Sequence, residues 1–219
     1  MNRIPQTRKA AAFGAFLLFL IPASSAWSGL LVNGDFEAGN TGFNSNYNFT
    51  LNHPPVTGIY GVVSNPQSWF GNMGSFGDHT SGTGLMLVGD GGPVADNLLL
   101  EYQVPLVAGT TYQFTGYFAE GGGGESVSQQ LFDVRLNGAS IASLDLTGSA
   151  VGDWQELSGS YTAAASDPAG LLTIHALRTD PIGNNFAIDD LQFSAVPEPS
   201  SLSIFGIGYL YLLRRRRNA

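Results

Sequence analysis

The sequence lacks cysteine altogether, which excludes disulfides, thiolate metal sites and thiol catalysis. Basic residues are almost as scarce away from the two ends. Seven of the nine Lys and Arg residues lie near the termini, and only Arg135 and Arg178 face the seventeen acids between Asp35 and Glu198. The part between the ends therefore has a formal charge of about −15 and repels phosphate backbones, so no nucleic-acid partner is expected. Such a charge suits divalent cations and favours solubility.

The sequence also lacks an apolar run of conventional membrane-spanning length, which is about 20 residues. It has two shorter apolar runs, one near each end. The first run, Ala10–Ile21, follows a basic start and precedes small residues at 24–26. This order is typical of a secretory signal peptide. We therefore expect residues 1–26 to be a signal peptide, with an uncleaved membrane anchor as the alternative.

The second apolar run, Leu202–Leu213, stands between a proline triplet and a basic tail. The flanking residues are Pro197, Glu198 and Pro199 before it, and Arg214, Arg215, Arg216 and Arg217 after it. The prolines end the last strand and form an extended spacer. A helix over this run rises only about 18 Å, against a hydrocarbon core of about 30 Å. We expect a short C-terminal transmembrane helix that anchors the chain transiently, with the arginines on the cytoplasmic side.

This C-terminal arrangement resembles the PEP-CTERM sorting signal of Gram-negative, exopolysaccharide-producing bacteria. The resemblance implies recognition by an exosortase, a membrane protease or transpeptidase, with processing near the triplet. The domain would first stand on the periplasmic side of the inner membrane and then reach the cell surface or the extracellular matrix. The expected organisation is a signal peptide at 1–26, one domain at 27–195 and a sorting signal at 196–219, with an ordinary tail anchor as the alternative.

Between the ends, apolar residues alternate with a period of two, and no helical period of 3.6 is present. In 111–118, for example, Tyr112, Phe114 and Phe118 share one face. Ten short strands are expected, at 30–33, 59–64, 84–88, 97–104, 111–118, 132–136, 139–146, 154–162, 171–177 and 186–193. Asn137-Gly138 predicts a hairpin, and residues 38–80 are expected to form long loops with one or two strands. The pattern predicts an all-β, antiparallel jelly-roll β-sandwich.

The order of short motifs in this domain is similar to that of carbohydrate-binding jelly-roll modules of the galactose-binding-like group, often attached to xylanases and cellulases. The matching pieces are Leu31–Glu37, Gly82–Val88, Val107–Phe114, Trp154–Thr162 and Phe186–Leu191. The resemblance covers about residues 30–194. It implies a β-sandwich, extracellular polysaccharide as a partner and a structural calcium ion.

Four acids are the expected metal ligands: Glu37 and Asp189 first, then Asp190 and Asp35. The first and last strands of a sandwich can lie side by side, and carboxylates brought together repel unless a hard cation binds them. Ca²⁺ takes six to eight oxygen ligands, so carbonyls of the glycine-rich 77–84 region could complete the shell. Strict alternation places Asp189 on one face with Leu191 and Phe193, buried and in need of a partner. The alternative is that these acids are exposed or cap turns.

Sugar-binding modules stack aromatic rings on sugar faces. The expected ligand-binding residues are Trp69, Phe70 and Tyr60 in the loop-rich segment, with Phe76 nearby, and Tyr117 on an outward sheet face. Gln113 and Arg135 are expected on that same face as Tyr117. Trp69 is the candidate most expected to be exposed, and core packing is the alternative for each ring.

No nucleophile elbow or HExxH spacing accompanies His53, His79 and His175, so no enzyme is expected. The sequence thus favours a non-catalytic surface or matrix protein that binds or associates with polysaccharide. A purely structural matrix component is the second hypothesis, and a secreted glycan-active enzyme is the third.

Overall fold

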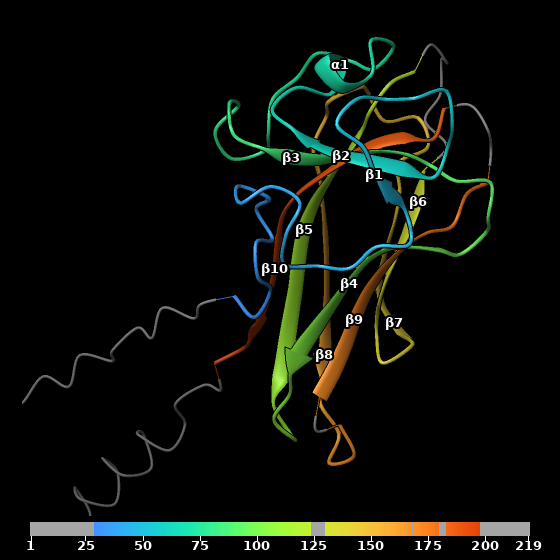
Figure 1. Cartoon of the computed structure of the whole chain (residues 1–219). Coiled ribbons are helices and arrows are strands. Elements are labelled where there is room, and N and C mark those ends of the chain that lie inside the picture. The colour runs from blue at the N-terminus through green and yellow to red at the C-terminus, as the bar shows by residue number, and fades with distance from the viewer. Residues whose placement is uncertain (1–28, 124–129, 168, 180–182, 198–219) are drawn as a thin grey trace, which may run out of the picture.

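The structure is a computed structural model that describes residues 29–123, 130–167, 169–179 and 183–197 (Figure 1). Two β-sheets pack face to face. The six-stranded sheet has the order β1 (Asn48–Phe49), β2 (Ile59–Val63), β3 (Met86–Asp90), β10 (Asn185–Ala195), β5 (Thr111–Glu120) and β8 (Gln155–Thr162). The four-stranded sheet has the order β4 (Asn97–Pro105), β9 (Ala169–Ala176), β6 (Leu131–Leu136) and β7 (Ala139–Asp145). The predicted all-β sandwich is confirmed, and its strands pair antiparallel except β1 with β2.

Between the sheets lies a core of large aromatic and aliphatic side chains. The predicted alternation of core-facing and outward-facing residues in β5 is confirmed, since Tyr112, Phe114 and Phe118 are all buried in this core. The rings of Phe118 and Phe132 lie 4.9 Å apart and join the two sheets. This packing fixes which side chains of each strand point outward, and those side chains are the ones available for function.

A second apolar cluster covers one half of the outer face of the six-stranded sheet. It consists of Ile59, Met86, Val88, Ala119 and Ala187 on the strands and of Trp69 and Met73 above them. Trp69 ends the short helix α1 (Pro66–Trp69). Gly61 lies directly below it, and a Cβ there would approach the indole Nε1 to 2.6 Å. The chain after β2 therefore folds back over its own sheet.

Every predicted strand except the first is present, with ends that shift by up to two residues. The exception is 30–33, where the chain turns instead of forming a strand. It still follows β10, because the N–H of Leu30 donates to the carbonyl of Phe193 at 2.7 Å and Gly34 accepts the N–H of Leu191 at 2.8 Å. The predicted hairpin between β6 and β7 is confirmed, with positive φ at both Asn137 (50°) and Gly138 (81°).

A β-bulge interrupts β10, and the strict alternation predicted for 186–193 is wrong at this point. The register against β5 shifts between Asp189 and Gln192, and Asp190 has a φ of 49°. Ile188 faces the core before the bulge, and Leu191 faces it after the bulge. Asp189 is therefore on the outer side of the sheet, opposite to the face of Leu191.

The signal peptide expected at 1–26 lies outside the described residues, and so does nearly all of the sorting signal expected at 196–219. In the described ranges, no helix has the length and apolar character needed to cross a membrane.

Candidate functional site

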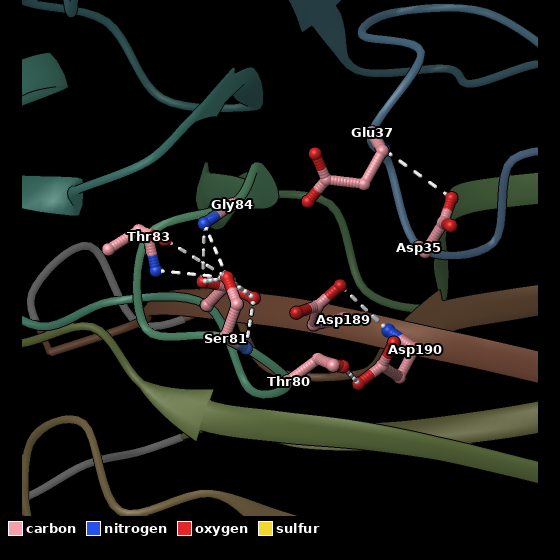
Figure 2. Close-up of a pocket in the computed structure, with 9 residues that line it drawn as sticks. Asp35, Glu37, Thr80, Ser81, Thr83, Gly84, Asp189 and Asp190 are labelled. Atoms are coloured by element: carbon pink, nitrogen blue, oxygen red, sulfur yellow. Dashed lines mark hydrogen bonds between the residues drawn. The ribbon is translucent and has the colours of Figure 1, made fainter.

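A pocket of about 400 Å³ opens on the six-stranded sheet, where the opening segment, the loop after residue 77 and the β10 bulge meet (Figure 2). It is lined by Asp35, Glu37, Asp78, Thr80, Ser81, Thr83, Gly84, Asp189 and Asp190. The structure thus brings together all four acids predicted as ligands. It adds Asp78, which is not among the predicted ligands.

The bulge is what sets Asp189 and Asp190 beside the opening segment. Gly34 packs its backbone against the bulge, and a Cβ at this position would overlap the carbonyl oxygen of Leu191. Only glycine allows this approach. Asp35 and Glu37 follow at once in the chain, so their carboxylates reach the pocket from the opposite side to Asp189 (Figure 2).

Asp78 organises the loop that forms the third wall. Its carboxylate accepts the backbone N–H groups of Ser81 at 2.8 Å and of Gly84 at 2.6 Å, together with the Ser81 hydroxyl. Burial raises the pKa of Asp78, but these hydrogen bonds outweigh burial and hold the pKa below its ordinary value. Asp78 therefore stays ionised, and the loop presents the hydroxyls of Thr80, Ser81 and Thr83 along the pocket.

Asp189 is the most buried acid of the pocket, with 1% of its surface exposed. Its two oxygens accept the N–H groups of His79 at 2.9 Å and of Asp190 at 2.8 Å. Burial raises the pKa of Asp189 to about 7; these N–H groups oppose the rise, and the charges of Asp190 and Asp78 add to it. At neutral pH this carboxyl needs a proton or a cation nearby.

Neither internal arginine supplies that cation. Arg135 pairs with Asp96 and Asp133 on the other sheet, and Arg178 pairs with Asp145. Among the described residues, the basic side chain that contacts the pocket lining is His79, through Asp190.

His79 and its neighbours form an aromatic rim beside the acids. Its Nδ1 lies 2.7 Å from the Asp190 carboxylate, which also accepts the Thr80 hydroxyl. The imidazole stacks on Tyr117, with ring centroids 3.5 Å apart and planes 13° apart, and Trp154 meets it edge-on at 5.9 Å. Tyr117 was a predicted ligand-binding residue. His79 is not among the residues predicted to bind a ligand, although its place among the hydroxyls and glycines of 77–84 is a usable signal.

The donor set fits an oxygen-preferring cation such as Ca²⁺, since every lining side chain that could ligate offers oxygen. Glu37 Oε1 accepts the N–H of Leu85 at 2.8 Å and faces Asp78 across Gly84. Within the described ranges, however, no three His, Cys, Asp or Glu side chains converge tightly enough to hold a metal. A cation would need carbonyl or hydroxyl oxygens of the loop as well as carboxylates.

The expectation that Trp69 is exposed is wrong: it is 3% exposed, and its indole N–H donates to the carbonyl of Thr50 at 3.1 Å. Tyr60 is also buried, with its hydroxyl donating to Asn40 at 2.6 Å. Phe70 is half-buried and stacks on His53, with centroids 3.8 Å apart. Thr50 and His53 lie against Trp69 and Phe70, whereas Tyr60 packs into the main core between the sheets. These rings therefore form no open platform.

Gln113 and Tyr117 do not share a face with Arg135, contrary to expectation. The first two point outward from β5 in the six-stranded sheet, whereas Arg135 lies on β6 in the other sheet. The described histidines contact Asp90, Asp190 or Asp96, and none hydrogen-bonds to a serine hydroxyl in the described ranges. The described residues thus contain no Ser–His pair of the kind used in nucleophilic catalysis.

No protein-family profile matches the sequence, and no curated protein matches it. Among solved structures, the Stig cyclase Fisc from Fischerella sp. TAU is 13% identical, with 80% of this chain and 100% of that chain covered and a TM-score of 0.50. The arabinose-bound α-L-arabinofuranosidase MgGH51 is 15% identical, with 77% and 26% covered and a TM-score of 0.51. The CBM22-2 xylan-binding domain from Paenibacillus barcinonensis Xyn10C is 18% identical, with 74% and 98% covered and a TM-score of 0.48. At these identities the similarity concerns the β-sandwich fold alone.

Proposed function

We propose that this chain is a non-catalytic β-sandwich protein that binds or associates with polysaccharide at the acidic pocket. The observation that carries the proposal is the pocket itself, in which carboxylates and hydroxyls stand beside the stacked rings of His79 and Tyr117. Carboxylates accept hydrogen bonds from sugar hydroxyls, and the Ser and Thr side chains both donate and accept. An aromatic rim next to a few directed polar groups is the usual make-up of a small-ligand site.

Export and sorting complete the proposal. The signal peptide at 1–26 carries the chain across the inner membrane, and the PEP-CTERM signal at 196–219 holds it there until an exosortase acts near Pro197. The domain then reaches the cell surface or the extracellular matrix, where polysaccharide is available. The support for this part is the order of basic, apolar and proline-containing segments in the sequence.

A structural Ca²⁺ in the pocket is the second part of the same proposal. Glu37 and Asp189 would hold it, with Asp35, Asp190 and Asp78 close by. A bound Ca²⁺ supplies positive charge next to carboxylates. Glu37 comes from the opening segment and Asp189 from β10, so ligation by both would join the first and last parts of the domain.

The test is retention on immobilised polysaccharide with about 2 mM calcium present, a concentration above the Kd range of extracellular calcium-binding modules. We expect His79→Ala and Tyr117→Ala to lose retention, and Phe49→Ala to keep it, since Phe49 is a partly exposed ring outside the pocket lining. No retention of the unaltered chain on any polysaccharide would leave the purely structural matrix role.

The glycan-active alternative rests on one observation, the pKa of about 7 for Asp189, because glycosidases keep one buried carboxylic acid protonated. Release of reducing ends from the same polysaccharides, abolished by Asp189→Asn, would replace binding by hydrolysis as the function.

A further inference from the structure

Below the pocket, the outer face of the six-stranded sheet continues as a grid of hydroxyl and amide side chains. We define the flat polar face as Thr111, Gln113 and Thr115 on β5, Ser158, Ser160 and Thr162 on β8, and Gln192 and Ser194 on β10. Gln113 stands between Ser160 and Ser194, and Thr115 stands between Ser158 and Gln192. The next row along these strands contains Glu156, Tyr117 and Asp189, and so reaches the pocket.

This half of the sheet is open in the described part of the chain. The second apolar cluster covers only the half that carries Ala119 and Ala187, together with β2 and β3. All eight side chains of the flat polar face are exposed or half-buried. The hydroxyls of Thr115, Ser158 and Ser160 make no hydrogen bond to another described protein group, so they are free to bind a ligand.

The flat polar face is also rigid. The opposite sides of its strands are fixed in the core by Tyr112, Phe114, Leu157 and Phe193. Ser and Thr have short side chains and lose little rotamer entropy when a ligand orders them. A ligand that lies on this face therefore binds a preformed surface, which lowers the cost of association.

None of the eight side chains is charged, although the chain between its ends carries seventeen acids against two arginines. A uniformly uncharged face is complementary to an uncharged polymer, and the acids elsewhere repel polyanions. A second copy of the chain fits poorly, because the centre of a protein interface is built from apolar and aromatic side chains. From Thr111 to Tyr117 the strip on β5 is about 20 Å long, which exceeds a single sugar.

We propose that the flat polar face is a contact surface for an extended, uncharged polysaccharide that continues from the pocket. This inference rests on the proposed function and sharpens it: the ligand is the interior of a neutral chain several sugars long. A single sugar and an anionic polymer are both excluded as the principal ligand.

The test compares Ser158→Lys with Gln103→Lys, which places the same side chain at an exposed position of β4 on the opposite sheet. The probes are hydroxyethyl cellulose, arabinoxylan and galactan as neutral polymers and alginate as an anionic one, measured by affinity electrophoresis. The lysine would stand in the path of the polymer, so we expect about tenfold weaker binding for Ser158→Lys and no change for Gln103→Lys. We also expect hexasaccharides of the preferred polymer to bind at least about tenfold more tightly than its monosaccharide.

The outcomes separate this inference from the proposed function. Loss of binding in His79→Ala but not in Ser158→Lys would overturn the flat polar face alone. A preference for alginate, equal affinity for monosaccharide and hexasaccharide, or a loss in Gln103→Lys alone would also overturn it. A dimer in sedimentation that Ser158→Lys dissociates would assign the face to a second copy. No binding of any polymer by the unaltered chain would remove both proposals. Thermal unfolding of both lysine variants checks that they fold.

Discussion

The carboxylate of Asp189 accepts the backbone N–H of His79 at 2.9 Å, across 110 positions of sequence. Asp190, the next residue, binds the ring of the same histidine at 2.7 Å. The two acids of the β10 bulge thus hold the loop that carries the pocket hydroxyls and the stacked imidazole. Because the loop depends on carboxylates, the shape of the pocket is coupled to their charge.

Asp189→Asn is expected to change how stability depends on pH. The pKa of Asp189 is about 7 in the folded chain and 3.8 as the ordinary value, so the folded state binds the proton more tightly. The stability from this group is present below about pH 4 and is lost as the pH rises through about 7. In chelator, the unaltered chain should lose about 2 to 4 kcal/mol more than Asp189→Asn between pH 4.5 and pH 8.

Urea unfolding at the two pH values measures this difference. The comparison of the two chains cancels the histidines and the other acids, which titrate in both. Parallel stability profiles would show that Asp189 has no raised pKa in the folded chain.

Calcium is expected to raise the melting temperature. A ligand at one hundred times its Kd adds about 2.7 kcal/mol of stability, which corresponds to roughly 5 to 10 °C for a domain of this size. Glu37→Gln should abolish most of the rise, because it removes charge from one of the two leading ligands. Glu101→Gln is the matched control, since Glu101 lies on β4 in the other sheet.

Differential scanning calorimetry in calcium and in chelator gives the measurement. An unchanged melting temperature, with no metal found by elemental analysis, would remove calcium from the proposal. If Glu37→Gln and Glu101→Gln lose the calcium-induced rise in melting temperature equally, the ion binds acids outside the pocket.

Much of the fold could be predicted from alternation and turn chemistry. The pattern of Tyr112, Phe114 and Phe118 places one face of β5 in the core, and Asn137-Gly138 defines a hairpin by its own backbone preference. These signals depend only on residues close together in the sequence, so they can be recognised without knowing the tertiary structure. The strand predicted at 30–33 is wrong, because this segment joins β10 through single backbone hydrogen bonds at Leu30 and Gly34 and does not extend into a ladder.

The site was predicted in part, for a related reason. The two acidic motifs at Asp35 and Asp189 were found, and the fold brings them into one pocket. The bulge was not foreseen, because one extra residue in β10 becomes visible only against its partner strand β5. The burial of Trp69 was missed because the cover over it comes from the chain at 50–53, and no local pattern encodes that contact.

Trp69 is expected to act through stability and not through binding. Trp69→Ala removes a buried indole from the second apolar cluster and should cost about 3 to 5 kcal/mol. Trp69→Phe keeps most of the apolar volume and loses the hydrogen bond to Thr50, so it should cost less and bind polysaccharide like the unaltered chain. Urea unfolding and affinity electrophoresis separate the two effects. Lost binding in a fully folded Trp69→Phe would return Trp69 to the ligand site.

Gly34→Ala tests the contact that builds the pocket. A Cβ at Gly34 would overlap the carbonyl of Leu191, so the opening segment must move away from the bulge, at a cost of about 1 to 3 kcal/mol. Gly29→Ala is the matched control, because nothing lies within 4 Å of a Cβ there. We expect Gly34→Ala also to weaken the calcium response, since Glu37 would shift relative to Asp189. Urea unfolding with and without calcium measures both effects. If Gly34→Ala matches Gly29→Ala in stability and in calcium response, the opening segment does not depend on this approach to the bulge.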